Sequence, residues 1–346
     1  MNPTSFNQTS ATWIVPVLVL LLACLIQPVA AITVTDDAGT AVTLNKIPQR
    51  IVSLAPSNTE LLVSLGLRDR MVGVTDVCDY PPAVQNITRI GGYSAISTEK
   101  VAATRPDLVV ASDITPQETV SRLRGLGLTV VVVSPCNIDD MIRDIGVVGT
   151  LTGTMTRADE LAANLSARLS AVAAAASKTD KPTVAHVVWH SPLYVSGNDT
   201  LQNDAIEHAG GVNRFSEKSG WGTVSLEEFL TANPDIIIVN GGGGMDSTSS
   251  DVILEAFMTN PQYASLSAVK NHRVYAVNAD TISRAGPRIV DATEQVATII
   301  NSWHYERAAT NPVALPATTS KTPGFAGQVA LLGLGACIVL MRRYRL

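Results

Sequence analysis

The sequence predicts an α/β protein of two similar Rossmann-like lobes, each a parallel sheet flanked by helices, joined by one long rigid helix. Two observations predict this fold class. Short apolar strands alternate with helices along most of the chain, which is typical of parallel sheets covered on both faces. In addition, residues 92–110 recur as residues 220–238, with Gly, an aromatic residue, Ser, Glu and Pro-Asp at matching offsets before an apolar strand. The chain therefore carries one structural unit twice.

The N-terminal lobe is expected over residues 32–138. Its predicted strands span residues 51–54, 72–75, 108–111 and 129–133, and its predicted helices span residues 57–65, 98–104 and 118–126. The helical residues 139–180 follow, and from 161 to 178 they are rich in Ala and Leu without Pro or Gly. We expect them to form the connecting helix. Alternation resumes in the C-terminal lobe, residues 181–308, with strands at 183–189, 236–240 and 273–277 and helices at 203–209, 226–230, 252–258 and 287–305.

The repeat places a serine, Ser97 or Ser225, directly before a predicted helix, where its hydroxyl can cap the first turn. Each repeated acid, Glu99 or Glu227, then falls in that first turn, where the helix dipole stabilises a carboxylate. This is a sufficient structural reason for an acid. It does not explain why the acid recurs together with the aromatic residue six positions before it.

Both ends of the chain are apolar. Residues 13–26 form an apolar run followed by small residues, so residues 1–31 are predicted to be a signal peptide. Residues 309–323 are expected to form a stalk, and residues 324–346 a transmembrane or sorting segment whose terminal arginines lie in the cytoplasm. Residues 322–325, Thr-Pro-Gly-Phe, resemble the archaeal Pro-Gly-Phe sorting signal, after which the tail is replaced by a lipid. Whether this segment is a sorting signal or a plain anchor, we expect the folded part to lie on the extracellular face of the membrane.

Composition excludes several classes of function. The chain is 46% hydrophobic and 16% charged with a net charge of -5, which fits a globular protein and does not suit nucleic-acid binding. A nucleophile elbow, a phosphate-binding loop, a dinucleotide fingerprint and an H-E-x-x-H motif are missing. His186 and His190 would lie roughly 13 Å apart on one strand, too far for one metal. We expect a monomer that is not an enzyme, with no catalytic residue, resident cofactor or metal site.

Export bears on the cysteines and on three glycosylation sequons. Cys78 and Cys136 each follow a predicted strand, so both would lie at the carboxyl edge of one parallel sheet. An oxidising location favours their pairing as a disulfide, with free thiols as the alternative. The sequons begin at Asn86, Asn164 and Asn198 and are candidates for surface sugar.

Two lobes that face each other through loops at the carboxyl ends of their strands form the plan of a ligand-binding clamp. Tyr80, Tyr93, Trp189 and Trp221 all fall in or beside such loops, and His190 is expected in the pocket wall. Flat aromatic walls suit a large ring-bearing ligand better than an ion or a sugar. For any one of these residues, ordinary core packing is the alternative.

Residues 50–60, 79–82, 92–110 and 283–288 together resemble the periplasmic cobalamin-binding proteins of ABC importers. These belong to a wider group, the class III substrate-binding proteins, which includes binders of iron-siderophores and haem. The resemblance runs from about Thr33 to Tyr305. It implies two lobes joined by one rigid helix, with a corrinoid ligand, expected to be cobalamin, bound between them. It also implies delivery of this ligand to an ABC permease dimer with its ATPase subunits.

The resemblance also implies roles for single residues. Tyr80 and Trp221 match aromatic residues of the family's cleft, and Tyr93 stands where the family has a tryptophan, which keeps a ring but narrows the wall. Glu99 and Glu227 match acids on each lobe's outer rim that meet arginines of the permease.

The roles of two arginines, and the function of the protein, each have alternatives. Arg284 and Arg288 are candidates to contact an anionic group of a ligand, as siderophore binders require, although Arg288 opens a helix and has a structural alternative. The first alternative function is therefore a ferric siderophore or haem binder of the same transporter class. A secreted two-lobed enzyme would need an ordered Ser/His/Asp or metal constellation in the cleft. A surface sensor would lack a permease partner.

Overall fold

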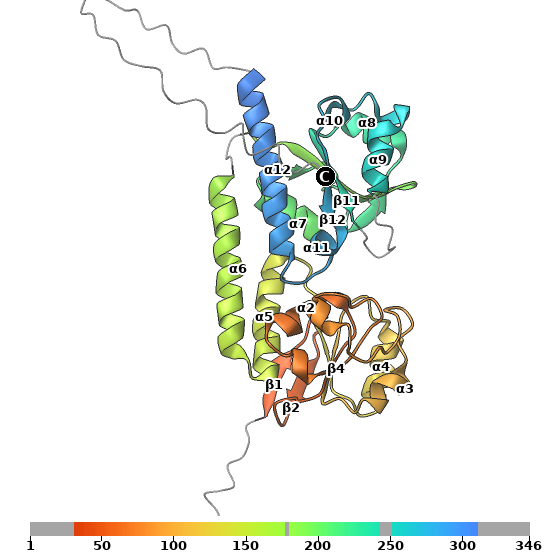
Figure 1. Ribbon diagram of the computed structural model, residues 1–346, viewed down its shortest axis with the longest axis vertical. Coiled ribbons are helices and arrows are strands. Elements are labelled where there is room, and N and C mark those ends of the chain that lie inside the picture. Colours follow the sequence, from red (N-terminus) through yellow and green to blue (C-terminus); the bar gives the residue numbers. More distant parts are fainter. Residues whose placement is uncertain (1–30, 177–179, 243–250, 311–346) are drawn as a thin grey trace, which may run out of the picture. The chain divides into compact units, whose positions relative to one another are not determined.

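The computed structural model describes residues 31–176, 180–242 and 251–310 (Figure 1). The described residues up to Tyr305 belong to one compact unit. The predicted signal peptide, stalk and transmembrane or sorting segment lie almost entirely outside the described residues. Among the helices of the described ranges, none is long and apolar enough to cross a bilayer.

The N-terminal lobe is built on a four-stranded sheet in which all neighbouring strands are parallel. In spatial order its strands are β4 (Met71–Val74), β3 (Ile51–Ser53), β5 (Leu108–Ala111) and β6 (Val130–Val132). Its helices are α2 (Pro56–Ser64), η1 (Arg68–Arg70), η2 (Pro82–Val84), α3 (Thr98–Ala103) and α4 (Gln117–Gly125). β3 and β5 are apolar and buried along almost their whole length, as expected of strands covered on both faces. Every strand and helix predicted in this lobe is present.

An antiparallel hairpin that the sequence analysis did not predict precedes this sheet. It consists of β1 (Ile32–Thr35) and β2 (Ala41–Leu44). At its turn, Asp36 accepts hydrogen bonds at 3.1 Å from the guanidinium of Arg124 and from the backbone N–H of Val132 in β6. The hairpin is therefore fastened to the edge of the N-terminal sheet.

The C-terminal lobe has a mixed sheet rather than the parallel sheet that we expected. Its main path is β10 (Trp221–Thr223), β8 (Leu193–Ser196), β7 (Thr183–His190), β11 (Ile236–Gly241) and β12 (Val274–Asn278), and β9 (Val212–Asn213) also pairs with β7. β8 and β10 are antiparallel to their neighbours, whereas the other pairs are parallel. The helices are α7 (Leu201–His208), α8 (Leu226–Ala232), α9 (Val252–Thr259), η3 (Pro261–Tyr263), α10 (Ser267–Lys270), α11 (Ala279–Ser283) and α12 (Ile289–Thr310).

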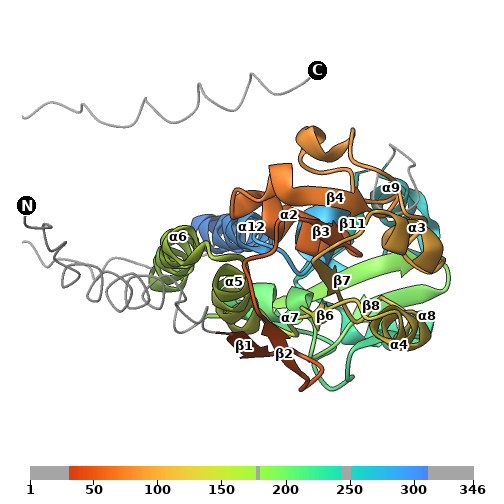
Figure 2. The same ribbon diagram turned by 90° about the horizontal axis from the view of Figure 1, so that it is seen from below.

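The connection between the lobes is two helices and not the single helix that we predicted. α5 (Ile138–Thr152) ends at Gly153, whose left-handed backbone (φ 69°) turns the chain into α6 (Met155–Ala175). The two helices lie side by side in both views (Figures 1 and 2). Gly149 makes this close approach possible, because a Cβ atom there would lie only 2.5 Å from the Cβ of Ala158 in α6. The connection is therefore a helical hairpin.

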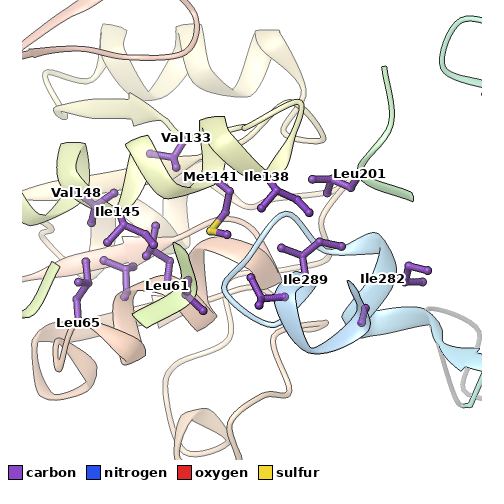
Figure 3. Close-up of a cluster of buried hydrophobic side chains, with 14 of the residues drawn as sticks. Leu61, Leu65, Val133, Ile138, Met141, Ile145, Val148, Leu201, Ile282 and Ile289 are labelled. Carbon is purple, nitrogen blue, oxygen red and sulfur yellow. The ribbon is translucent and has the colours of Figure 1, made fainter. Parts of the chain in front are cut away.

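One buried apolar cluster is shared by both lobes and by the connecting helices (Figure 3). It includes Leu61 of α2, Ile138 and Ile145 of α5, Leu201 of α7 and Ile289 of α12. Burial of one such side chain contributes about 1.5–3 kcal/mol to folding. Two smaller clusters fill the rest of the C-terminal and N-terminal lobes.

The two copies of the repeat occupy equivalent places. β5 lies between β3 and β6, and β11 lies between β7 and β12. Both serines cap their helices as predicted: Ser97 Oγ accepts from the N–H of Lys100 at 3.2 Å, and Ser225 Oγ accepts from the N–H of Glu228 at 3.0 Å. The repeat is thus one structural unit used twice.

The repeated Pro-Asp has its own structural role. Asp107 accepts hydrogen bonds from the backbone N–H groups of Gln49 and Arg50 at 2.8 and 3.2 Å, directly before β3. Asp235 accepts from the backbone N–H and hydroxyl of Thr183 at 2.9 and 2.7 Å, at the start of β7. Each aspartate therefore fixes the beginning of the neighbouring strand, and this part of the repeat needs no functional explanation.

Candidate ligand-binding site

Three aromatic side chains share one face of the antiparallel ribbon β7–β8–β10. Trp189 of β7 lies opposite Tyr194 of β8, and Trp221 of β10 lies opposite Ser196, two residues further along β8. Because alternate residues of a strand point to the same face, Trp189, Tyr194 and Trp221 lie on one side of the ribbon. Trp189 and Trp221 are 39% and 48% exposed, so their rings are open to solvent on that side.

A β-bulge brings Trp189 onto this face. In a regular strand Trp189 would share the face of Val187, which is fully buried in the core of the C-terminal lobe. Between these two residues the register of β7 against β8 shifts by one position, so Trp189 pairs with Tyr194 instead. The indole N–H then donates to the backbone oxygen of Ser191 at 2.9 Å. The orientation of this tryptophan is therefore set by backbone geometry.

His190 lies beside Trp189, with ring centroids 5.0 Å apart. The side chain is half-buried, and its Nδ1 is buried with no hydrogen-bond partner in the part of the chain that the structure describes. Across the described residues no group of three or more His, Cys, Asp or Glu is arranged to hold a metal ion. His190 pairs with Leu193, so strand alternation places it on the other face of the ribbon from Trp189 and Tyr194, and its role in a pocket wall stays a prediction.

The other histidine of β7 belongs to a buried polar network. His186 Nδ1 lies 2.6 Å from Ser196 Oγ, and its Nε2 lies 3.1 Å from Asn240 Oδ1 of β11. Burial lowers the pKa of His186 to about 4, so the ring is neutral at physiological pH. Histidine with a serine and an amide has the composition of a hydrolytic triad. His186 and Ser196 are, however, completely inaccessible to a substrate, and the network links β7, β8 and β11 within the sheet.

Two further aromatic residues lie in loops of the N-terminal lobe. Tyr80 follows β4 and is 43% exposed, and Tyr93 precedes α3 and is 38% exposed. The guanidinium of Arg288 lies over the ring of Tyr80, 3.8 Å from its centroid. Neither tyrosine is packed in a core, so both remain candidates for a ligand surface.

Arg284 and Arg288 are bound to carboxylates of the chain itself. Arg288 Nε and Nη2 donate to the two oxygens of Glu60 at 2.8 and 2.6 Å, and Glu60 holds the pKa of Arg288 above its ordinary value. Arg284 Nη1 contacts Glu60 at 3.0 Å and Asp79 at 2.9 Å, and its Nη2 contacts Asp280 at 2.8 Å. These five residues form an ion-pair cluster in which three carboxylates face two guanidinium groups.

The predicted disulfide is wrong, because Cys78 and Cys136 are free thiols. Cys78 is buried, its sulfur accepts a hydrogen bond from the hydroxyl of Thr59 at 3.1 Å, and burial raises its pKa. Cys136 is exposed. The two cysteines follow β4 and β6, which are the opposite edges of the four-stranded sheet. Such edges lie about 14 Å apart, whereas a disulfide needs Cα atoms within about 7 Å.

Glu99 and Glu227 are exposed in the first turns of α3 and α8. The backbone N–H of Glu99, then the hydroxyls of Ser97 and Thr98, lower the pKa of Glu99 and keep it charged. A surface hollow of about 400 Å³ lies beside Glu227 and contains none of the exposed aromatic residues. Both acids are therefore exposed at the surface.

Two residues of this site were missed by the sequence analysis. Tyr194 was missed because the short strand β8 was not predicted, although the Leu-Tyr-Val sequence after Ser191-Pro192 is a usable strand signal. Glu60 was not named as a candidate because it lies in a predicted helix, residues 57–65, that carries no recognisable functional motif. An acid beside Leu61 and Leu62 is the one signal of its burial.

The comparisons with known proteins cover most of the folded part. The periplasmic binding protein family model matches residues 51–281. An uncharacterized ABC transporter substrate-binding lipoprotein, YvrC of Bacillus subtilis, is 31% identical over 274 residues, which are 77% of this chain and 84% of the relative. The cobalamin-binding protein of Halobacterium salinarum is 30% identical over 281 residues, 79% of this chain and 74% of the relative.

Solved structures share the fold. The periplasmic vitamin B12-binding protein BtuF of Vibrio cholerae is 27% identical with a TM-score of 0.66, covering 74% of this chain and 98% of that structure. The periplasmic haem-binding protein RhuT of Roseiflexus sp. RS-1 is 25% identical, with the same TM-score and the same coverage. The same fold thus occurs in proteins named for different ligands.

Proposed function

The chain belongs to the periplasmic binding protein family, and from this we infer that it is the substrate-binding protein of an ABC importer that captures a corrinoid, with cobalamin as its ligand. The family consists of solute-binding proteins and not of enzymes, as the sequence predicted. A permease dimer and its ATPase subunits are then the partners of this protein.

The observation that supports this ligand is a set of five partly exposed aromatic rings. Trp189, Tyr194 and Trp221 share one face of the C-terminal ribbon, and Tyr80 and Tyr93 stand in loops of the other lobe. Only 5% of the chain is aromatic, so this concentration is unusual. Large flat apolar surfaces bind the faces and edges of a macrocycle well. We propose that Tyr93 and Trp221 form the two ends of this wall.

The charge of the ion-pair cluster favours a corrinoid over the alternatives. Haem and many ferric siderophores carry carboxylate or other anionic groups, and they need cationic side chains that are free to pair. Arg284 and Arg288 already face the carboxylates of Glu60, Asp79 and Asp280, three negative groups against two positive ones. Cobalamin carries neutral amides around its corrin ring and a single phosphodiester, so it needs fewer such cations.

The position of the repeated acids supports the transport role. Glu99 and Glu227 are exposed at equivalent places of the two lobes, which gives a permease dimer two matching contacts. We propose that the C-terminal segment, outside the described residues, holds the protein at the extracellular face of an archaeal membrane. Recovery of the mature protein with a lipid, or with the intact terminal arginines, distinguishes sorting from plain anchoring.

Titration of the purified protein tests the ligand. We expect the absorption spectrum of cyanocobalamin to change on binding, and haemin and a ferric siderophore to give no saturable change. Saturable binding of haemin or the siderophore without cyanocobalamin binding would replace the corrinoid by that ligand.

Trp221→Ala tests the wall. Truncation of a central aromatic residue at a binding surface weakens binding by about thirtyfold, and the 48% exposure of Trp221 predicts little change in the melting temperature of the empty protein. The matched control is Tyr305→Ala, which removes an aromatic side chain that is 79% exposed and outside the site. Calorimetric titration with cyanocobalamin should give wild-type affinity for the control, and equal affinity for Trp221→Ala would remove Trp221 from the site.

A further inference from the structure

The ion-pair cluster joins segments of the two lobes that are far apart in sequence. Glu60 belongs to α2 of the N-terminal lobe, and Arg288 directly precedes α12 of the C-terminal lobe. The side chain of Glu60 is only 2% exposed, and both of its oxygens accept from Arg288. A bidentate pair of this kind is geometrically specific, because the planar guanidinium can meet both oxygens in one orientation only.

The loop that carries the two arginines is seated closely on α2. Ile282 and Ile289 flank this loop, and both belong to the same buried cluster as Leu61, the neighbour of Glu60 (Figure 3). Gly286, in the middle of the loop, lies so near α2 that a Cβ atom there would be 3.3 Å from the backbone oxygen of Ser57. The position of the guanidinium groups is thus fixed by packing as well as by charge.

Both arginines of this loop hold the segment that carries Tyr80. Arg284 binds Asp79, the residue before Tyr80, at 2.9 Å, and Arg288 covers one face of the Tyr80 ring at 3.8 Å. Since one face is covered and the side chain is still 43% exposed, the exposed area lies on the other face and the edge of the ring. A cation over an aromatic face also adds attraction that depends on its position.

We propose that Glu60 and Arg288 are positioning residues that act through Tyr80: Glu60 orients the guanidinium of Arg288, which holds the ring of Tyr80 with its free face toward the ligand. The ring of one lobe is therefore set by a residue of the other. This inference rests on the proposed function for the ligand itself, but the orientation of the ring is a property of the empty protein.

A double-mutant cycle tests the coupling. In the full mature chain, we expect Glu60→Gln to weaken cyanocobalamin binding about tenfold, and Tyr80→Ala to weaken it by at least the same factor. If Glu60 acts through Tyr80, Glu60→Gln should have no further effect once Tyr80 is alanine. Effects that multiply in the double variant, or wild-type affinity of Glu60→Gln, would overturn the proposal.

Two additional variants separate positioning from general stability. Arg288→Lys keeps a positive charge for Glu60 but removes the planar group over the ring, and we expect the same loss of affinity as for Glu60→Gln. The control is Arg168→Lys, because Arg168 also joins two helices through carboxylates, Glu294 at 2.7 Å and Asp291 at 2.6 Å, in α12. The control should lower the melting temperature without changing affinity, and a loss of affinity equal to that of Arg288→Lys would contradict the special role of Arg288.

Ring resonances of ¹³C-labelled tyrosine give a readout without ligand. The Tyr80 signal, assigned by its loss in Tyr80→Ala, should shift in Glu60→Gln and Arg288→Lys and stay unchanged in Arg168→Lys. An unshifted signal in both variants would refute the positioning role. A wild-type protein that does not bind cyanocobalamin would instead refute the proposed ligand, and the ring signal would still decide the positioning role.

Discussion

Asp144 of α5 shows how burial alters the chemistry of one carboxyl group. The residue is 2% exposed, and its Oδ2 has no hydrogen-bond partner within the described ranges. Burial, and then the negative charge of Asp37, raise its pKa to about 7 although Arg143 lies 3.0 Å away. The folded protein therefore keeps a proton on Asp144 at pH values where the unfolded chain, with an ordinary pKa of 3.8, has lost it.

The sign of the pH dependence follows from this difference. Between about pH 4 and pH 7 the folded state binds one proton more than the unfolded state, so this group makes stability fall as pH rises, and the loss is complete above the folded pKa. Asp144→Asn resembles the protonated form. The quantity to compare is the unfolding free energy of Asp144→Asn minus that of wild type. We expect this difference to be about 2–3 kcal/mol larger at pH 8 than at pH 5.

Urea unfolding at the two pH values measures this difference. Asp69→Asn is the control. The Asp69 side chain is 94% exposed, so this substitution should change the unfolding free energy equally at both pH values. A pH-independent difference between Asp144→Asn and wild type would show that Asp144 is charged in the folded protein.

At the scale of single residues, the sequence predicted positions better than partners. The repeat led to Tyr93, Trp221 and the two exposed acids, Glu99 and Glu227, because matching offsets are visible in a linear sequence. The partners of Arg284 and the separation of Cys78 from Cys136 were not predictable in this way. They depend on strand order and on contacts between distant segments, which a single sequence does not contain.

The helical hairpin α5–α6 is the element whose form depends most on one small side chain. Ala at Gly149 would place a methyl group 2.5 Å from that of Ala158, so the helices would have to separate. We expect Gly149→Ala to lower the free energy of unfolding by about 1–3 kcal/mol.

A glycine in the same helix supplies the comparison. A Cβ atom at Gly146 meets no atom within 4 Å, so Gly146→Ala should add helix propensity and stabilise the protein by up to about 1 kcal/mol. Urea unfolding of both variants measures the two effects. Similar stabilities for the two alanine variants would show that the contact between α5 and α6 is looser than described.

At the scale of elements, sequence predicts the structure where periodicity is strong and fails where a single residue decides. All the longer strands and helices were predicted, but the connecting segment was read as one helix from its uniform second half. Gly153 was the available sign of two helices, because glycine commonly ends a helix in the left-handed conformation. β8 has a local strand signal in Leu193–Val195, whereas the three-residue β10 exists through its pairing with β8, which local sequence does not specify.

For the molecule as a whole, the two exposed acids predict a separation of binding from transport. Glu99→Lys combined with Glu227→Lys should abolish uptake of the proposed ligand, cobalamin, in cells with the importer, because both proposed permease contacts would become repulsive. Ligand affinity should stay unchanged. The control is Glu118→Lys with Glu255→Lys, which reverses one exposed charge on each lobe elsewhere. Normal uptake by the first double variant would show that these acids do not dock the protein.

The apolar cluster shared by both lobes and the helical hairpin has a consequence for cooperativity. Residues of α2, α5, α7 and α12 pack in one interior, so neither lobe can lose its structure without exposing apolar surface of the other. Scanning calorimetry should therefore show a single heat-absorption peak, and a saturating ligand should move that whole peak upward. Two separate peaks would contradict this view. A protein that melts in one step presents the importer with an intact clamp or with none, and no half-folded form competes for the permease.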